Sequence, residues 1–519
     1  CSTKMRLTTN SGPICNNSSP ENTCYVENPG LRRQRVENLT NLRGESVLFF
    51  NLLLSTYMKV IKVGGGCLKG EAAIGQILEL MATRGPGNIF VASALNGVTD
   101  FLIRGMKEAL AQEEQVPQII HKLREIHLGV ARYVIGECRE YEQFCKDFEQ
   151  SLKKLERLYY GLNFTREITP RLYDMISSFG ERFAVELLVY TLRCQGMQAL
   201  YRMPEKIGLI TDGVFGDATA NLAKTAKNFE QQLVPLLNKD AIIFIPGFFG
   251  ISEQGDVTTF GRGGSDYAAA VIAAAAQAEK LEIWKDVAGF MSADPKFVPE
   301  AQLIPVLSYE EAAELAYFGA KILHPRTIDP VRKKRLEIEI RNTLAPDTQG
   351  SVITSESPRA KFLIKSVAHN AAIGVIKIHA SGVGARPGIL GHVADRLAEQ
   401  GLNIKSVVTS QTCISLLLDA VDLDAGYHAL KTMTPKPYQR IEKLDNVAMI
   451  GIVGEGLLQS KGIAAQCFTA VAKSGINIEM ISMGPSRAAL YFLVHHEELH
   501  KAVSAIHATF FPEQPVESQ

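Results

Sequence analysis

The sequence predicts an α/β protein in which one large, mostly parallel sheet is followed by two smaller α/β units. Apolar strands alternate with amphipathic helices from Met58 to about Ile353, the pattern of a parallel sheet covered by helices. An internal repeat follows in the C-terminal part of the chain. At 519 residues the chain is also too long for a single hydrophobic core, so several domains are expected.

Charge and cysteine content narrow the class of protein. The chain has 55 Lys+Arg and 55 Asp+Glu, which leaves no net field to attract nucleic acid or an anionic membrane, and we expect neither as a partner. Nine cysteines without a CxxC pair fit neither a disulfide framework nor a zinc site. Reduced thiols and a cytoplasmic location are therefore expected.

Residues 1–57 differ from the rest of the chain. They are rich in Asn, Ser, Thr and Pro, which bury little surface, and we expect a disordered N-terminal extension. The apolar run 47–58 is shorter than the roughly 20 residues that a membrane span needs. Acidic residues in the extension, at Glu21, Glu27, Glu37 and Glu45, also argue against an organelle transit peptide. We place the start of the first domain at Met58.

The start of the large unit sets its pattern. Residues 58–63 predict a buried strand, 64–70 a glycine turn, 71–85 a helix and 88–94 a second strand, so this is a β-turn-α-β unit. The helix is expected to bury one apolar face, formed by Ile74, Ile77, Leu78 and Met81. Further strands are expected at 198–203, 241–247 and 280–287, and helical runs around 104–160, 171–195 and 219–238.

The first glycine turn indicates a phosphate site. In parallel sheets ligands bind beyond the carboxyl ends of the strands, where Gly64–Gly66 falls. Without side chains, the backbone N–H groups can approach a phosphate, and Lys62 supplies an ammonium nearby. A plain tight turn explains the glycines alone about equally well.

The segment GRGGSD, residues 261–266, is a more specific signal. An alanine-rich helix follows it, and Ser265 or Asp266 is expected to cap that helix. A turn and a cap account for every residue except Arg262. A guanidinium beside a helix N-terminus makes a pocket for a carboxylate or phosphate, while Asp266 can pair with an ammonium on the same ligand. This combination suits an amino acid placed beside a nucleotide.

An ordered series of motifs runs through the chain: KVGGG (62–66), SALNGVTD (93–100), SSFGERF (177–183), TFGRGGSDYAAA (259–270), EIWKDVAGFMSADPK (282–296), ELAYFGAKILHPRTI (314–328) and IRNTLAPDTQGSVI (340–353). This series resembles the aspartate kinase family of the amino acid kinase superfamily. The resemblance implies an amino-acid-kinase fold, a mostly parallel sheet sandwiched by helices. It also implies transfer of a phosphoryl group from ATP, with Mg²⁺, to the β-carboxylate of L-aspartate, the first step of lysine, threonine and methionine biosynthesis.

The resemblance also implies site residues. Lys62 and Asp266 are the expected catalytic pair, with Lys62 stabilising the transferred phosphoryl group. A carboxylate substrate is already ionised at neutral pH, so no general base and no catalytic histidine are expected. Aspartate is expected to contact Thr99, Glu181, Arg262, Gly263, Gly264 and Ser265, with Glu181 near its ammonium. The nucleotide is expected to contact Lys62, Val63, Gly64, Gly65, Lys285, Asp286, Met291, Lys296, Lys321 and Ile322.

Several of these residues have plain structural alternatives when taken singly. Asp286 suits a turn, Lys296 a solvated loop, and Lys321 a helix surface. His324 is interpreted as structural, and the cluster HHEELH (495–500) as a solvated helix start, so no metal ligand is assigned.

The sequence departs from the family pattern in the first loop and in the nucleotide segment. Val63 stands where Phe is usual, and Gly66-Cys67 lacks the usual Thr or Ser hydroxyl. Met291 replaces an aromatic residue and Lys296 replaces Arg, which loses bidentate geometry. These changes put phosphate contacts and nucleotide affinity in question.

The C-terminal repeat has a constant offset of 74 residues. Each copy reads as a βαββ unit of ferredoxin type, and the first helix is expected to bury Leu390, Val393, Ala394 and Leu397. The paired positions are Gly388 with Gly462, Gly401 with Gly475, Asn403 with Asn477, and Ile404 with Ile478.

The paired units resemble ACT domains, which implies two ferredoxin-like βαββαβ ACT domains that bind an amino-acid effector, lysine or threonine. A homodimer is the default expectation because the sheet edges of such units commonly pair between chains. The expected divisions are 1–57, 58–355, 362–440 and 441–515. Because no homoserine dehydrogenase module follows, we expect a single activity.

Two alternatives stay open. One is another amino acid kinase acting on a glutamate-like acid, whose extra methylene would have to fit between Arg262 and the γ-phosphate. The other is a catalytically weak amino-acid sensor, motivated by Gly66-Cys67 and opposed by the retained Lys62, Arg262 and Asp266.

Overall fold

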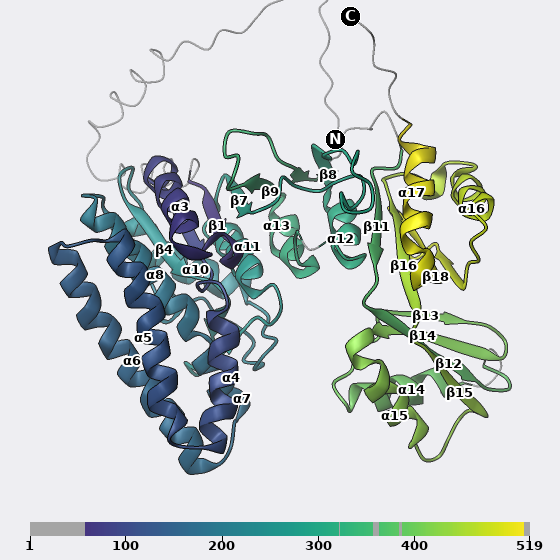
Figure 1. Ribbon diagram of the computed structural model, residues 1–519, viewed down its shortest axis with the longest axis horizontal. Helices are drawn as coiled ribbons and strands as arrows, with labels where there is room; N and C mark the ends of the chain where they lie inside the picture. The colour runs from purple at the N-terminus through teal and green to yellow at the C-terminus, as the bar shows by residue number, and fades with distance from the viewer. Residues whose placement is uncertain (1–57, 321, 356–362, 384–386, 513–519) are drawn as a thin grey trace, which may run out of the picture. The chain divides into compact units, whose positions relative to one another are not determined.

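The structure is a computed structural model that describes residues 58–320, 322–355, 363–383 and 387–512 (Figure 1). The expected extension at 1–57 lies outside these residues. No helix in the described part of the chain combines the length and apolar character that a bilayer span requires.

An eight-stranded sheet forms the centre of the first unit. The strand order is β3-β4-β2-β1-β7-β9-β10-β8, and among these pairings only β9 with β10 is antiparallel. The mostly parallel sheet predicted from the sequence is confirmed. The strands are β1 (Val60–Val63), β2 (Ile89–Ala92), β3 (Ala199–Tyr201), β4 (Ile242–Pro246), β7 (Lys280–Lys285), β8 (Val306–Ser308), β9 (Glu337–Asn342) and β10 (Val352–Thr354).

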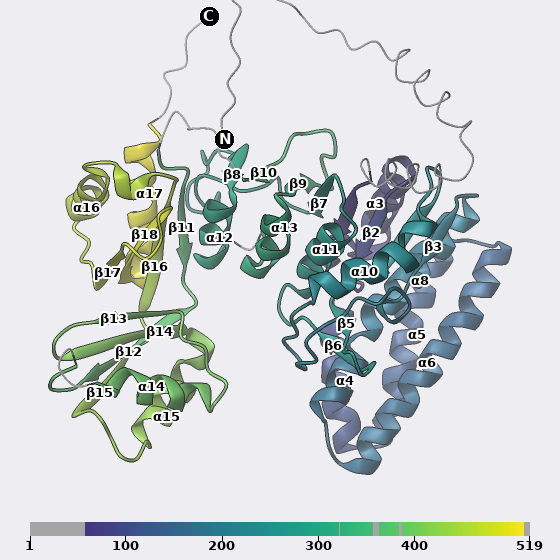
Figure 2. The same ribbon diagram turned by 180° about the vertical axis from the view of Figure 1, so that it is seen from behind.

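Helices cover both faces of this sheet (Figures 1 and 2). Successive strand residues enter different cores, because side chains alternate across a strand: Val60 joins one core and Ile61 the other. The face with Ile61 packs against α3 (Gly70–Arg84), α4 (Val98–Ala111), α5 (Gln115–Val134), α6 (Arg139–Thr165), α7 (Pro170–Ser177) and α8 (Phe179–Cys194). The face with Val60 packs against α9 (Pro204–Ile207), α10 (Leu222–Gln232), α11 (Gly264–Ala275), α12 (Tyr309–Tyr317) and α13 (Ile328–Lys334).

Several local predictions can be compared with these elements. The apolar face of α3 is confirmed, with Ile74, Ile77, Leu78 and Met81 all buried. The helical run expected around 104–160 consists of parts of three helices, α4 to α6. The hairpin of β5 (Phe249–Ile251) and β6 (Val257–Thr259) was not expected from the sequence. Three short 3₁₀ turns complete the unit, at Gly65–Cys67, Val234–Leu236 and Pro325–Thr327.

Two cysteines are paired. A disulfide joins Cys138, at the start of α6, to Cys194, at the end of α8. The expectation that all thiols are reduced is wrong for this pair, because residues 56 apart in sequence meet where the two helices pack side by side.

The first repeat unit is a contiguous βαββαβ fold with an antiparallel sheet of order β13-β14-β12-β15. Its elements are β12 (Ile373–His379), α14 (Ile389–Ala398), β13 (Ser406–Thr409), β14 (Cys413–Asp419), α15 (Leu423–Lys431) and β15 (Arg440–Leu444). The buried face of α14 consists of Ile389, Val393 and Leu397, whereas Leu390 is exposed. The prediction for Leu390 was wrong by one position of the helical turn.

The second repeat unit has the same arrangement of strands and helices, except that one strand of its sheet comes from a different place in the sequence. Its elements are β16 (Val447–Val453), α16 (Ile463–Lys473), β17 (Met480–Met483), β18 (Ala489–His495) and α17 (Leu499–Phe510). The starts of β12, α14 and β13 (373, 389 and 406) recur at 447, 463 and 480, an offset of 74. Strand β11 (Ser366–Asn370), which precedes the first unit in sequence, pairs with β16 and takes the place that β15 has beside β12. A linear division between 440 and 441 therefore leaves one strand of the second sheet outside it.

Candidate active site

The first glycine loop lies between the ends of two strands that flank β1. The N–H of Gly64 donates a hydrogen bond to the carbonyl of Trp284 in β7, at 3.3 Å. A Cβ on Gly65 would lie 3.1 Å from the carbonyl oxygen of Ala94, which follows β2. A side chain at Gly65 would therefore crowd the backbone, at the carboxyl end of the strands where a ligand of a parallel sheet is expected.

Three charged side chains meet beside this loop. Lys62, on β1, places its Nζ 2.5 Å from one carboxylate oxygen of Asp266, on α11. Lys285, at the end of β7, places its Nζ 3.2 Å from the other oxygen. The Lys62 and Asp266 side chains are 6% and 8% exposed, so both charges are largely desolvated. Two ammonium groups on one carboxylate leave a net positive charge next to backbone N–H groups, which suits a phosphate.

Burial and ion pairing have opposite effects on the pKa values of Asp266 and Lys285. Burial alone raises the pKa of the Asp266 carboxyl, but the ammonium groups of Lys62 and Lys285 outweigh it and hold the pKa below its ordinary value. Burial lowers the pKa of the Lys285 ammonium, an effect that the attraction of Asp266 reduces. Asp266 is therefore an ionised carboxylate in the described fold.

The turn before α11 requires its glycines. Gly261 and Gly263 have positive φ values of 70° and 68°, and a Cβ on Gly263 would lie 2.3 Å from the Cβ of His324. Gly263 is the N-cap of α11, without a side-chain cap bond, so the prediction of a cap at Ser265 or Asp266 was wrong. The helix starts earlier because the left-handed glycine turns the chain. The side chains of Ser265 and Asp266 are consequently available to the site.

Glu181 lies opposite this turn, in the first turn of α8. Its side chain is buried, and Ser265 Oγ donates to its Oε1 at 3.5 Å. Burial raises the pKa of Glu181 to about 8, against the lowering effects of backbone N–H groups, Ser265 and Lys62. Its Oε2 is buried and has no hydrogen-bond partner among the described residues. An unpaired buried carboxylate oxygen indicates a place for a donor from a ligand.

The remaining predicted substrate residues lie near the start of α8 or in the turn before α11. A Cβ on Gly180 would lie 3.5 Å from the hydroxyl of Thr99, which is at the start of α4, so Thr99 is near the start of α8. Arg262 is exposed in the turn before α11, and its guanidinium has no partner among the described residues. Gly264 follows Gly263 at the start of the helix.

The other predicted nucleotide residues are placed less closely. Val63 is buried at the end of β1, and Asp286 is exposed after β7, 3.7 Å from where a Cβ on Gly66 would be. Lys296 is exposed, and its N–H donates to Asp294. Met291 and Ile322 are partly buried, and Lys321 lies outside the described residues. None of these positions is joined to the Lys62 cluster by a hydrogen bond or ion pair within the described residues.

Cys67 does not occupy the place of a site hydroxyl. Its side chain is buried, its Sγ donates to the carbonyl of Trp284 at 3.6 Å, and the Thr343 hydroxyl lies 3.7 Å from the same sulfur. Burial raises the pKa of this thiol. The departure at Cys67 thus falls on a position that packs beneath the loop, whereas the departure at Gly66 falls on an exposed residue.

Sequence reasoning missed two residues that support the site. Asp174 is fully buried on α7 and accepts hydrogen bonds from the N–H groups of Gly216 and Thr259, both at 2.8 Å. Arg326 stands in the HPRT segment, which the motif series includes, but no role was assigned to it. Their partners are mostly backbone groups of distant loops, which no local pattern announces.

Comparison with known proteins places the chain in a family. The model of the amino acid kinase family matches residues 58–342, which are 285 of the 519 residues. The chain therefore belongs to the amino acid kinase family. A model described as an ACT domain matches residues 450–510.

Individual relatives and solved structures similar to this chain are named aspartokinases. Aspartokinase 2, chloroplastic, of Arabidopsis thaliana is 28% identical over 478 residues, which cover 88% of this chain and 85% of the relative. Lysine-sensitive aspartokinase 3 of Escherichia coli is 28% identical over 461 residues, covering 87% of this chain and 99% of the relative. The crystal structure of E. coli aspartokinase III with aspartate and ADP superimposes with a TM-score of 0.74 at 26% identity, covering 88% of this chain and 100% of that chain.

Proposed function

We propose that the chain is an aspartate kinase, which converts ATP and L-aspartate to 4-phospho-L-aspartate and ADP. The observation that carries the proposal is the buried cluster of Lys62, Asp266 and Lys285 beside the glycine loop. Asp266 of this cluster follows Ser265, which donates to Glu181, and stands four residues after the exposed Arg262. Relatives named aspartokinase match almost the same share of the chain, 87% to 88%.

The amino acid would be held at both of its charged ends. Glu181 Oε2 accepts a hydrogen bond from the ammonium, which supplies the donor that this buried atom lacks. Arg262 pairs with the α-carboxylate in bidentate geometry. Thr99, Ser265 and the backbone of Gly263 and Gly264 complete the contacts.

The phosphate end is formed by the positive cluster. The β-carboxylate oxygen of aspartate attacks the γ-phosphorus, and the bond from that phosphorus to its bridging oxygen breaks, leaving ADP. No proton is transferred, because the attacking carboxylate is already ionised. Lys62 and Lys285, with the N–H group of Gly65, stabilise the charge on the transferred group. The N–H of Gly64 already donates to the carbonyl of Trp284. Asp266 holds the two ammonium groups in place.

For the nucleotide we propose the remaining positions named from the sequence. These are Val63, Asp286, Met291, Lys296, Lys321 and Ile322. Among the described residues no group of three His, Cys, Asp or Glu side chains forms a metal cage. Magnesium in phosphoryl transfer needs only one or two carboxylates besides phosphate oxygens, and exposed Asp286 beside Gly66 fits that demand. The ion would neutralise phosphate charge.

We also propose regulation and assembly through the repeat units. Lysine or threonine would bind to the two ACT units, one formed by β12 to β15 and the other by β11 with β16 to α17, after a catalytic domain in 58–355. Lysine sensitivity belongs to the name of the E. coli relative and is proposed here for this chain. A homodimer and a cytoplasmic location stay predictions.

The test is an acyl phosphate assay on the purified full chain. ATP, Mg²⁺ and L-aspartate are incubated with hydroxylamine, which traps 4-phospho-L-aspartate as a hydroxamate, and L-glutamate replaces aspartate in the matched control. Hydroxamate that depends on aspartate supports the proposal, and inhibition by lysine or threonine identifies the effector. A product only with glutamate, or none with either acid, contradicts it.

A further inference from the structure

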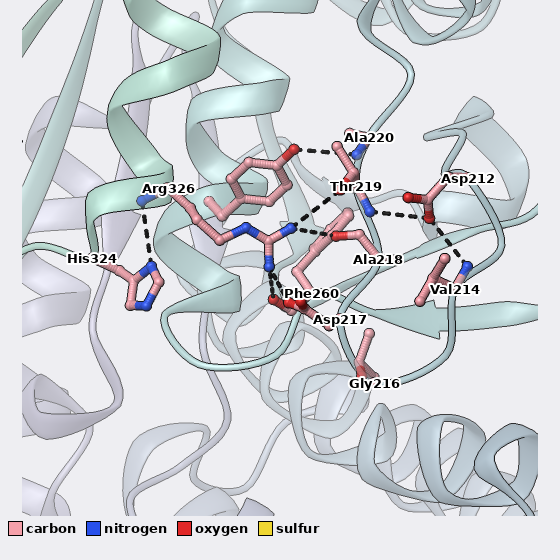
Figure 3. Close-up of polar contacts among 12 residues, drawn as sticks. Asp212, Val214, Gly216, Asp217, Ala218, Thr219, Ala220, Phe260, His324 and Arg326 are labelled. Carbon is pink, nitrogen blue, oxygen red and sulfur yellow. Dashed lines mark hydrogen bonds and ion pairs between the residues drawn. The ribbon is translucent and has the colours of Figure 1, made fainter. Parts of the chain in front are cut away.

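One arginine connects the turn that carries Arg262 to a second loop. Arg326 extends from the 3₁₀ turn Pro325–Thr327 into the space between them (Figure 3). One of its guanidinium nitrogens donates to the carbonyl of Phe260 at 3.1 Å and pairs with Asp217. The other donates to the carbonyl of Ala218 at 2.8 Å and to the hydroxyl of Thr219 at 3.4 Å. The fork thus joins backbone at 260 to backbone at 218.

The Gly261–Gly264 turn is also in close contact with the loop at 212–220 and with the segment that carries Arg326. A Cβ on Gly261 would lie 2.9 Å from the carbonyl oxygen of Gly216, and one on Gly263 would lie 2.3 Å from the Cβ of His324. The turn therefore lies between the loop at 212–220 and the segment that carries Arg326. The guanidinium lies 4.9 Å above the ring of Tyr267, in the first turn of α11, so it contacts the helix start as well.

The loop at 212–220, which Arg326 contacts, is also stabilised by hydrogen bonds that do not involve Arg326. One Asp212 carboxylate oxygen accepts hydrogen bonds from the N–H groups of Val214 and Thr219, both at 3.1 Å (Figure 3). Asp174 holds Gly216, and the N–H of Ala220 donates to the Tyr267 hydroxyl at 3.2 Å. Arg326 therefore connects the Arg262 turn to a loop with a fixed shape of its own.

The side chain of Arg262, by contrast, has no such support. It is exposed and unpaired within the described residues, two positions after the carbonyl that Arg326 holds. No contact of its own orients its guanidinium in the described fold, so the turn alone determines where the side chain can reach. A change in the turn of about 1 Å is enough to cost roughly a hundredfold in a positioned reaction.

We propose that Arg326 is a positioning residue, which holds the Gly261–Gly264 turn so that Arg262 meets the carboxylate of the substrate. The inference rests on the proposed function for the identity of that substrate. That Arg326 fixes the turn does not depend on the substrate and can be tested on the protein without a ligand. Arg rather than Lys is required because two carbonyls and a ring are contacted by one planar fork.

The test compares Arg326→Ala and Arg326→Lys with a matched control, Arg332→Ala. Arg332, on α13, pairs with Glu310, and both side chains are about half exposed, so the control removes an arginine and an ion pair away from the turn. In Arg326→Ala we expect KM for aspartate to rise about 10- to 100-fold, with KM for ATP unchanged. Arg326→Lys keeps the charge without the fork and should be intermediate. Arg332→Ala should match the wild type.

A double variant separates positioning from general stability. If Arg326 acts through Arg262, adding Arg326→Ala to Arg262→Ala raises KM for aspartate little further. Hydrogen–deuterium exchange of the peptide around 258–266 provides a readout without substrate: Arg326→Ala should exchange faster there than the wild type and Arg332→Ala.

The outcomes distinguish the two proposals. A wild-type chain that does not phosphorylate aspartate defeats the proposed function, and the exchange data then decide whether Arg326 fixes the turn. A wild-type chain that is active, with unchanged KM for aspartate and unchanged exchange in both Arg326 variants, overturns the inference. A lower melting temperature with equal loss of turnover for all substrates would make Arg326 merely structural and overturn it too.

Discussion

Asp266 and Glu181 are both buried carboxylates at one site, yet their pKa values are displaced in opposite directions. Asp266 has two ammonium partners, from Lys62 and Lys285, and its pKa lies below the ordinary value despite burial. Glu181 has backbone and hydroxyl donors but no cation at contact distance among the described residues, and its pKa rises to about 8.

The difference shows that partners decide which buried acid is charged, not burial itself. The Asp266 region is electrostatically complete before any ligand arrives, so it is suited to receive a phosphate on its excess positive charge. The Glu181 region is incomplete, because a buried oxygen lacks a donor. A ligand with an ammonium group would complete it. We therefore propose that the Asp266 region receives the phosphoryl group and the Glu181 region the amino group.

The largest effect is expected from Lys62→Ala, which removes the closer cation of Asp266. Turnover should fall about a thousandfold or more, because the charge on the transferred group loses its main stabilising donor and Asp266 loses its nearest partner. The measurement is kcat in the hydroxamate assay, with circular dichroism to confirm that the fold remains.

Lys59→Ala is the matched control for that variant. Lys59 directly precedes β1 and pairs with Glu282 at 3.0 Å, away from the Lys62 cluster. Its removal should leave turnover unchanged. Near-normal turnover in Lys62→Ala would show that Asp266 and Lys285 suffice and would contradict the role given to Lys62.

Much of this site could be predicted from residue types and order. Glycine runs next to Lys62 and Arg262 predicted ligand loops, and both lie at the same end of the sheet. The resemblance to the motif series predicted which residues belong to the site, but it did not predict which of their side chains contact one another. That Lys285 shares Asp266 with Lys62 follows from the parallel pairing of β1 with β7, which joins residues more than 200 positions apart.

The errors have physical reasons. Ser265 and Asp266 have strong capping propensity, but a glycine with positive φ turned the chain earlier and took the cap position. Leu390 lies at the edge of a helical stripe, where a period of 3.6 leaves the boundary open. Strand β11 joined the second repeat because sheet partners are chosen by tertiary packing, and a local pattern cannot specify them.

A smaller effect is expected from Lys285→Ala, which sharpens the comparison by leaving Asp266 with one cation. We expect kcat to fall about 10- to 100-fold, less than in Lys62→Ala, because Lys62 still pairs with the carboxylate. Lys280→Ala, at the opposite end of the same strand β7 and paired with Glu339, is the control and should keep full turnover. Equal losses in Lys285→Ala and Lys62→Ala would mean that the cluster acts as one unit.

The smallest effect is expected from Glu181→Gln, which tests the other region through pH. With a folded pKa near 8, Glu181 is mostly protonated at pH 7 in the free protein, and pairing with an ammonium must first ionise it. KM for aspartate should therefore fall by up to about tenfold as pH rises from 7 to 8.5 in the wild type, and this contribution should vanish in the variant. Kinetics across that range measure the difference.

The same pKa has a consequence for stability that needs no substrate. The folded pKa of about 8 lies above the ordinary value of 4.5, so the folded state binds the proton more tightly than the unfolded state. The stabilisation is fully present below pH 4.5 and is lost as pH rises through 8. Relative to Glu181→Gln, the melting temperature of the unliganded wild type should fall over this window. Parallel melting curves for the two proteins would mean that Glu181 is already ionised, as Asp266 is, and the contrast between the two carboxylates would not hold.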